Sequence, residues 1–450
     1  MTLLSNFRSL TLIAVAATIA LTGCSDSLTG ANEQVEQTES LAPAEKLRHA
    51  HLLDRALRAG PNQVAGKMPN QLGLIFKIKA QSIVERYALL QRYAFFERYA
   101  LVQRYEYDTA FDGFAVTIED TTGGTEFTSI LSALQLDPAI EWLEPDFSVG
   151  IPIAASLDGH VGQKIPWSVS YVGGHMSSAA SGDGLGAVDM DIYILDTGAT
   201  NDDLNIVESI DFSGSLDAGA VDPNDYDGHG THVAGIIAAK DDDAGLVGIA
   251  PGARIHNLKV LGDDGTSDVS VVIAAVEYMI EARMANPNTP MVVNLSLGEN
   301  IGTSAYTALD EALDMLAGLG VTIVVAAGNQ GVNASLVTPA HVASVITVGS
   351  HDADGFFNGF SNWGPDVDIL APGDDVVSLS PALGGTGSPV KMSGTSVATP
   401  HVAGAAALYL SANPSAGPQE VLAALLSAAR GGVKLTAGVT VNKSVYVGNF

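Results

Sequence analysis

The sequence predicts an α/β fold with a mainly parallel central sheet, preceded by a small α+β domain. From about residue 163 onward, helical stretches alternate with apolar ones, and this alternation predicts a parallel sheet covered by helices on both faces. The expected strands are rich in Val and Ile, as buried parallel strands are; they read MDIYILD, ARIHNLKVL, MVVNLSL, VTIVVAAGN and VASVITVGS. The expected helices between them read GTHVAGIIAA, DVSVVIAAVEYMIEARM and YTALDEALDMLAGLG.

The region 71–150 has the pattern of a separate small domain. QLGLIFKIKA and FDGFAVTIE alternate apolar and polar residues as strands do, and a helical stretch, FTSILSALQLDP, precedes the strand-like AIEWLEPDFSV. Between the first two strands, a six-residue phrase occurs four times in ERYALLQRYAFFERYALVQRYEY, residues 85–107. The run is too long for a usual strand. We therefore expect a helix over about 82–98 and a strand from about 102, with the repeat serving as scaffold.

Composition excludes one class of partner. The chain has 450 residues and a formal net charge of −29, from 50 acidic and 21 basic residues. A nucleic-acid partner is not expected, because phosphate binding needs clustered Lys and Arg. The acidic excess is typical of a soluble protein, in which like charges keep molecules apart.

The N-terminus has the pattern of an export signal. Arg8 precedes an apolar run, LTLIAVAATIALTG, that is too short for a membrane span. The run ends in Leu21-Thr22-Gly23-Cys24, which resembles a bacterial lipobox, and Cys24 is the only cysteine. We expect a lipoprotein signal segment over 1–24, a flexible polar tether over 25–70, and membrane contact through lipidated Cys24. The alternative is an ordinary secretory signal with an incidental cysteine.

Three later segments carry the residue types of a nucleophilic hydrolase. Asp196 follows a predicted strand in IYILDTGAT, His229 begins a helix in DGHGTHVAG, and Ser396 precedes a helix in KMSGTSVATPHVAG. Ser, His and Asp together perform acyl transfer: the hydroxyl attacks, the imidazole moves its proton, and the carboxylate orients the imidazole. His232 could compete for the role of His229. The chain order Asp, His, Ser differs from that of α/β-hydrolases, and no Gly-x-Ser-x-Gly turn surrounds Ser396.

The segments DTG, HGTHVAG and SGTSVATPHVAG resemble the signatures of the subtilisin family of serine endopeptidases, and VNLSLG, VVAAGN and PWSV agree. The likeness covers roughly 163–445. It implies a subtilisin-like three-layer fold with a seven-stranded, mainly parallel sheet and peptide-bond hydrolysis through an acyl-enzyme. The resemblance also implies the site residues: Asp196 as orienting acid, His229 as general base, Ser396 as nucleophile, Asn329 in the oxyanion hole and His232 as a non-catalytic histidine.

The resemblance implies further sites. Ser296-Leu297-Gly298 and Gly265 match segments that pair with the substrate backbone as an added strand. The small domain, 71–150, resembles the inhibitory and chaperoning propeptide of the family, so that 151–450 is the peptidase domain. A structural Ca²⁺ site is implied, with oxygen ligands from Gln163, Asp203, Lys240, Asp242, Ala244 and Leu246. The family has an Asn where Asp242 stands, and the region around Asp203 is shorter here.

The sequence therefore predicts an exported, monomeric serine endopeptidase that acts on proteins or peptides and is made as a self-processing zymogen inhibited by its own propeptide. One alternative is a catalytically silent surface lipoprotein that keeps the fold as a binding module; the intact Asp196, His229, Asn329 and Ser396 argue against it. A second is a serine esterase, which would need neither a propeptide nor substrate-backbone segments. The natural substrate, the preferred P1 residue, the membrane and the maturation bond within about 147–163 are not fixed by the sequence.

Overall fold

The computed structural model describes residues 46–52, 71–79, 102–119, 125–151, 155–156, 163–214, 222–242, 244–382, 387–436 and 438–450. All of them belong to one unit, Leu41–Phe450. The expected signal segment, most of the expected tether and the helix expected over 82–98 lie outside the described residues.

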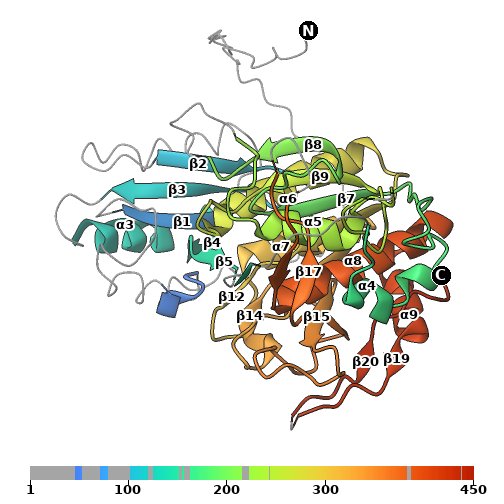
Figure 1. Cartoon of the computed structure of the whole chain (residues 1–450). Coiled ribbons are helices and arrows are strands. Elements are labelled where there is room, and N and C mark those ends of the chain that lie inside the picture. The colour runs from blue at the N-terminus through green and yellow to red at the C-terminus, as the bar shows by residue number, and fades with distance from the viewer. Residues whose placement is uncertain are drawn as a thin grey trace, which may run out of the picture. The chain divides into compact units, whose positions relative to one another are not determined.

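A mainly parallel sheet forms the centre of the larger part of the chain (Figure 1). Seven consecutive strands in its order, from β16 to β8, are parallel. This confirms the parallel sheet; two short strands, β19 and β20, extend it beyond the seven that the family resemblance implied. The strands are, in order across the sheet, β19 (Arg430–Gly431), β20 (Lys443–Ser444), β16 (Ile369–Pro372), β15 (Ile346–His351), β13 (Thr322–Ala326), β11 (Met291–Leu295), β7 (Asp191–Asp196), β9 (Arg254–Lys259) and β8 (Asn205–Asp211).

The five apolar stretches predicted as strands are β7, β9, β11, β13 and β15. The prediction did not include β8, because four of the seven residues in its sequence, NIVESID, are polar or charged and the strand lies at the sheet edge, half exposed. It also omitted β16, which is only four residues long and ends in a proline. Edge position and shortness both weaken the apolar signal by which buried strands are recognised.

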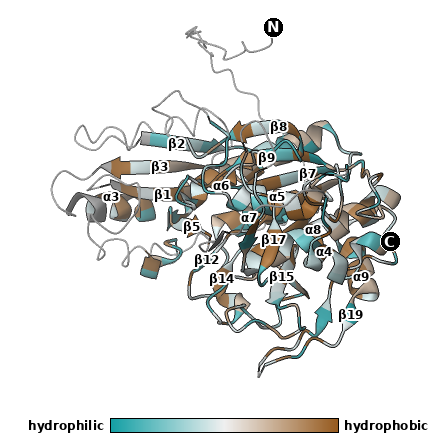
Figure 2. Cartoon of the chain, in the orientation of Figure 1, coloured by the Kyte–Doolittle hydropathy of each residue, from teal (hydrophilic) through white to brown (hydrophobic). Residues whose placement is uncertain are grey.

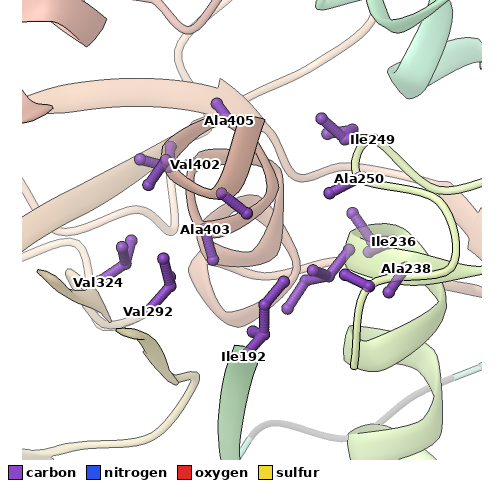
Figure 3. Close-up of a cluster of buried hydrophobic side chains, with 14 of the residues drawn as sticks. Ile192, Ile236, Ala238, Ile249, Ala250, Val292, Val324, Val402, Ala403 and Ala405 are labelled. Carbon is purple, nitrogen blue, oxygen red and sulfur yellow. The ribbon is translucent and has the colours of Figure 1, made fainter. Parts of the chain in front are cut away.

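Helices cover both faces of this sheet. On one face α5 and α8 pack on alternate strand residues such as Ile192, Val292 and Val324 (Figure 3). On the other face α6 and α7 pack on the intervening residues, including Tyr193, Leu195 and Val293. Successive strand residues thus point into opposite layers, which confirms the three-layer fold. The helical elements of this part are α4 (Trp167–Tyr171), η1 (Gly174–Met176), α5 (His229–Ala238), α6 (Val269–Ala285), α7 (Ala308–Gly318), η2 (Ala334–Leu336), α8 (Thr395–Ala412) and α9 (Pro418–Ala428).

Helix α8 is apolar on nearly all sides. Most of its side chains are buried, and it is rich in Ala, which lets the helix approach its neighbours closely. Coloured by hydropathy, hydrophobic residues are seen on helices and strands of the chain (Figure 2). A helix that is hydrophobic all round belongs in a large core or a membrane; among the described residues, however, no helix combines the length and the apolar character needed to cross a bilayer.

The small domain is an antiparallel sheet with its own helix. The strands run β2 (Val102–Tyr107), β3 (Gly113–Glu119), β1 (Gln71–Ile78) and β4 (Ile140–Pro145) across the sheet, and α3 (Thr125–Leu136) follows β3. One sheet face, with Phe76 and Phe114, packs in a cluster with α3. The opposite face, with Ile75, Ala115 and Trp142, is in the same core as α6 and α7. The strand expected from about 102 is β2.

Part of the expected flexible tether is ordered. Residues 46–48 lie along β4, where the Arg48 N–H donates to the Leu143 carbonyl at 2.8 Å and the Leu143 N–H donates to the Lys46 carbonyl at 2.9 Å. The side chain of Leu52 is buried. The expectation of a flexible tether over 25–70 is therefore wrong for this segment, because its apolar and basic side chains have partners in the folded chain.

Three small sheets complete the described structure. β5 (Ser148–Gly150) pairs with β10 (Thr266–Asp268), and β12 (Glu299–Asn300) pairs with β14 (Val337–Thr338). β18 (Val390–Met392) lies between β17 (Val376–Ser378) and β6 (Ala155–Ser156). The strands β5 and β6 belong to the chain that leaves the small domain, so that this chain is paired to the larger part at two places.

Candidate active site

Asp196 and His229 meet in a buried hydrogen bond. Asp196 is the last residue of β7, and His229 is the first of α5. The His229 Nδ1 and the Asp196 Oδ1 are 2.8 Å apart, and both side chains are almost fully buried. Burial alone would lower the pKa of His229, but the Asp196 carboxylate and this hydrogen bond outweigh burial and raise the pKa above its ordinary value of 6.5. The Nε2 of His229 has no partner among the described residues.

A second carboxylate, which the sequence analysis missed, fixes the start of α5. Asp225 accepts hydrogen bonds from the Gly228 N–H at 2.8 Å, from the Thr231 N–H at 2.8 Å and from the Thr231 hydroxyl at 2.6 Å. Its Oδ1 also accepts from the Thr197 hydroxyl, which in turn accepts from the Gly230 N–H. Asp225 thus ties the loop after Asp196 to the first turn of the helix that carries His229. The signal for it was an acidic residue just before a helix, where free N–H groups attract carboxylates.

Gly230 lets these two elements approach each other. A Cβ atom at this position would lie 2.0 Å from the Gly198 carbonyl oxygen and 3.1 Å from the Asp196 Cβ. Any side chain here would force β7 and α5 apart and lengthen the hydrogen bond between Asp196 and His229. The glycine in HGTH is therefore required by backbone contact.

Ser396 and Asn329 lie on adjoining segments. Ser396 is the second residue of α8 and is buried, with an Oγ that has no partner among the described residues. The Oδ1 of Asn329 accepts hydrogen bonds from the Thr395 N–H at 2.8 Å and the Thr395 hydroxyl at 3.0 Å. Because these two donors hold the Oδ1, the Nδ2 of the same amide points away from them. Thr395 is a positioning residue that the sequence analysis did not single out.

Two further predicted residues have defined partners. The Ser296 hydroxyl donates to the Ser396 carbonyl at 2.7 Å, which joins the segment after β11 to the start of α8. The Nε2 of His232 lies 3.1 Å from the Val376 carbonyl, and burial together with the nearby His229 lowers the pKa of His232 to about 3. His232 is therefore a neutral, structural histidine at ordinary pH.

The predicted substrate-backbone residues contact the chain that leaves the small domain. Gly298 forms an antiparallel bridge with Gly150, and the Gly265 carbonyl accepts from the Ile151 N–H at 3.2 Å. β5 therefore lies as an extended strand between the segments of Gly265 and Gly298. Further along, Ala155 and Ser156 pair with Lys391 and Val390, a few residues before Ser396.

The residues expected to bind calcium gather around one loop. The Gln163 Nε2 donates to the Lys240 carbonyl at 3.0 Å, and the Lys240 N–H donates to the Asp203 carbonyl at 3.0 Å. Lys164 bridges to Leu246, and the Ala244 N–H donates to the Asp242 Oδ1 at 3.3 Å. The Oδ2 of Asp203 is buried and has no hydrogen-bond partner among the described residues. Burial, and then the neighbouring Asp242 carboxylate, raise the pKa of Asp203 to about 7.

Comparison with known proteins decides the family. Residues 188–445 match the model of the subtilase family. The chain belongs to the subtilase family. It is a subtilisin-like serine endopeptidase, and the relatives that it matches are named as proteases or subtilisins.

An alkaline protease of Alkalihalobacillus alcalophilus is 38% identical over 286 residues, which cover 63% of this chain and 67% of that protein. An extracellular serine proteinase of Thermus sp. (strain Rt41A) is 35% identical over 343 residues, 74% of each chain. A cold adapted subtilisin-like serine proteinase of known crystal structure is 35% identical in sequence to this chain, and the two structures superpose with a TM-score of 0.50. The match covers 57% of this chain and 88% of that one.

The Asp196 contact makes a prediction about the titration of His229. In the Ser396→Ala protein, the imidazole of His229 should titrate by NMR with a midpoint above 6.5, because the carboxylate favours the charged ring. His232 and His401 serve as internal controls, since burial lowers the pKa of each to about 3 and neither should titrate near neutrality. Asp196→Asn should lower the midpoint of His229. A wild-type midpoint below 6.5, or one that Asp196→Asn leaves unchanged, would contradict this account of the pair.

Proposed function

We propose that this endopeptidase is made as a self-processing zymogen, in which Ser396 is the nucleophile, His229 the general base and Asp196 the orienting acid. The observation that carries the proposal is the position of the chain between the small domain and the peptidase. As far as Ile151, the chain that leaves the small domain is paired with the segments of Gly265 and Gly298. From Ala155 onward, the same chain is paired with β18. An extended strand between two substrate-binding segments is the way a peptide substrate binds by strand addition.

The chemistry follows from the side chains at the site. The Ser396 Oγ attacks the carbonyl carbon of the bound peptide while the His229 Nε2 takes the hydroxyl proton. The Asp196 carboxylate holds the Nδ1–H and stabilises the imidazolium. When the C–N bond breaks, the imidazolium gives its proton to the leaving amine. Water then attacks the acyl carbon while the His229 Nε2 takes a proton from it. As the bond between the acyl carbon and the Ser396 Oγ breaks, the imidazolium gives this proton to the Oγ, which releases the acid and restores the Ser396 hydroxyl.

Asn329 supplies a donor for the oxyanion of the tetrahedral intermediates. Its Oδ1 is held by Thr395, so the Nδ2–H group is aimed away from Thr395 before the reaction begins. The Ser396 N–H is the second donor that we assign, and it lies in the first turn of α8, where unpaired N–H groups and the helix dipole favour negative charge. Donors fixed in advance stabilise the developing charge without reorganising.

Self-processing gives a prediction about the maturation bond. The precursor should be cut between Ile151 and Ala155, because the chain is held as substrate on either side of these bonds. Wild type should yield a small-domain fragment whose C-terminal residue, read by mass spectrometry, lies within 151–154. Ser396→Ala should stay at full length, whereas Ser411→Ala, near the far end of the same helix, should be processed like wild type. Equal processing of wild type and Ser396→Ala, or a first cut outside 151–155, would contradict the proposal.

The oxyanion assignment predicts the effect of removing one donor. Asn329→Ala should lower kcat on a peptide substrate with little change in KM, because the donor acts in the transition state. The expected loss of about 10² to 10³ is the range known for this type of donor in subtilisin itself and is borrowed from that relative. Gln330→Ala removes an exposed amide at the next residue and should change kcat by less than about twofold. Equal kinetics of Asn329→Ala and wild type would exclude the oxyanion role.

We further propose a structural Ca²⁺ site at the loop 240–246. Calcium prefers carboxylate and carbonyl oxygens, and the partnerless, buried Asp203 Oδ2 is a group that a cation would satisfy. The described residues contain no group of three or more His, Cys, Asp or Glu placed to hold a metal, so backbone oxygens have to complete the set. Gln163 must turn its amide oxygen inward. The ligands that we assign are the side chains of Gln163, Asp203 and Asp242 and the carbonyls of Lys240, Ala244 and Leu246.

Chelation tests the calcium site. With the nucleophile blocked by a serine-directed reagent, a chelator should lower the Tm of the wild-type peptidase by several degrees, since a ligand at about 100 times its Kd contributes about 2.7 kcal/mol to the free energy of unfolding. Asp203→Asn should abolish this sensitivity. The neighbouring and exposed Asp202→Asn should keep it. A chelator that leaves the wild-type Tm unchanged would contradict the proposed calcium site.

We also propose export and anchoring through lipidated Cys24, with proteins or peptides as substrates and no nucleic-acid partner. The lipobox-like segment supports the anchor, and a relative described as an extracellular serine proteinase supports export. Cys24→Ala should move the precursor from the membrane fraction to the soluble fraction. Because the proposed cut follows the small domain, the lipid stays with that domain and the peptidase itself carries no anchor.

A further inference from the structure

Residues 46–52 contact the small domain and the peptidase at the same time. Along β4 the segment makes two backbone hydrogen bonds with Leu143, and the guanidinium of Arg48 stacks on the Trp142 ring at 4.1 Å. The same guanidinium forms an ion pair of 2.8 Å with Glu311 of α7. One side chain thus connects the two parts of the chain that maturation separates.

Two histidines extend this contact onto the loop before α7. The His51 Nε2 lies 2.5 Å from the Ile301 carbonyl, and the His49 Nε2 lies 3.3 Å from the Tyr306 carbonyl. These bonds are made to backbone atoms of the peptidase, at residues other than the Gly265 and Gly298 segments that contact β5. The segment is therefore a second attachment of the small domain, separate from the strand that passes through the substrate-binding segments.

We propose that residues 46–52 and Glu144 form a pH-dependent latch, which holds the small domain on the peptidase in mildly acidic to neutral medium and loosens as the medium becomes alkaline. The inference rests on the proposed function, because a latch between two domains matters only where one is cut from the other. Its partner is the surface of the peptidase formed by residues 301–311.

The centre of the latch is a buried carboxyl group facing a buried imidazole. The Oε2 of Glu144 and the Nε2 of His49 are 3.9 Å apart, too far for a hydrogen bond, and neither side chain is exposed. The Oε1 of Glu144 accepts from the Ala308 N–H at the start of α7 at 3.0 Å. The Oε2 of Glu144 and the Nδ1 of His49 have no partner among the described residues. An ionised carboxylate in this place would be desolvated and incompletely paired, which is costly.

Protonation changes on docking follow from this geometry. Burial, foremost among the causes, raises the pKa of Glu144 from 4.5 to about 8, and burial lowers the pKa of His49 from 6.5. A raised carboxyl pKa stabilises docking below 4.5, and this contribution is lost as the pH rises toward 8. A lowered imidazole pKa acts with the opposite sign below 6.5. Below 6.5 the lowered pKa of His49 opposes the loss caused by Glu144, whereas between 6.5 and 8 only Glu144 acts and docking weakens.

Asp310 faces the pair from the peptidase, where its carboxylate is bonded to Thr307, Thr338 and His341 of the peptidase itself. Those contacts belong to one domain and stay when the other leaves. The charged and titratable groups that face the pair are Arg48 and His51 on the latch, Lys77 on β1, and Asp310, Glu311 and His341 on the peptidase.

Hydrogen exchange of the full-length Ser396→Ala precursor tests the latch without requiring any cleavage. After correction for the intrinsic exchange rate, protection of residues 46–52 and of the Ala308 amide should change less from pH 5 to 6.5 than at higher pH. It should then fall by up to about tenfold per pH unit up to pH 8, as expected for one proton released on opening. Glu144→Gln, which keeps an oxygen for the Ala308 N–H, should remove this fall. Glu141→Gln, on the same strand and partly exposed, should keep it.

Two further variants separate the latch from general loss of structure. His49→Gln should remove the opposing effect of the imidazole, so that the protection of residues 46–52 already falls from about pH 4.5. Arg48→Met keeps the stem that covers Trp142 but loses the Glu311 pair, and it should lower protection at every pH without changing the slope. Protection that is flat from pH 6.5 to 8 in the parent, or an unchanged fall in Glu144→Gln, would overturn the latch. Self-processing of the wild type is measured separately by gel electrophoresis. Failure of the zymogen proposal can therefore be distinguished from failure of the latch.

Discussion

Two acidic side chains at the end of β4 determine how the small domain sits on the peptidase. Glu144 accepts the Ala308 N–H at the start of α7, and Asp146 accepts both the N–H and the hydroxyl of Ser270 at the start of α6. The oxygen atoms of both side chains accept N–H groups of a first helical turn, which have no partner within the helix. Once these two contacts are made, the chain that follows Asp146 is directed along β10. Docking of the small domain and occupation of the proposed substrate-binding segments are therefore coupled.

The parallel sheet creates the site into which that chain is directed. Asp196 ends β7 and Asn329 follows β13, so the carboxyl ends of strands in one sheet supply two of the proposed catalytic groups, as is general for open α/β sheets. His229 and Ser396 come from the first turns of α5 and α8, which pack on the same sheet face. Asp225 and Thr395 then fix the orientation of His229 and Asn329, which composition alone would not reveal. The same neighbourhood provides Gly265 and Gly298 for binding an extended chain.

Most of the fold and the central residues of the site could be predicted from the sequence, because buried parallel strands and three signature segments are strong local signals. β8 was missed because an edge strand with charged residues lacks the apolar run that identifies its neighbours. Asp225 was missed because its role depends on a turn that brings it onto the first helical N–H groups. The segment 46–52 was misjudged because its order comes from partners more than 90 residues away, such as Leu143 and Glu311.

The central claim is that the chain between the two domains lies in the active site as a substrate before it is cut. A crystal structure of the Ser396→Ala precursor tests this most directly. The account predicts continuous density from Ile151 to Ala155, with one peptide carbonyl within hydrogen-bond distance of the Asn329 Nδ2 and its carbon beside residue 396. A precursor in which this segment runs outside the site, leaving the Asn329 Nδ2 to water, would contradict the account.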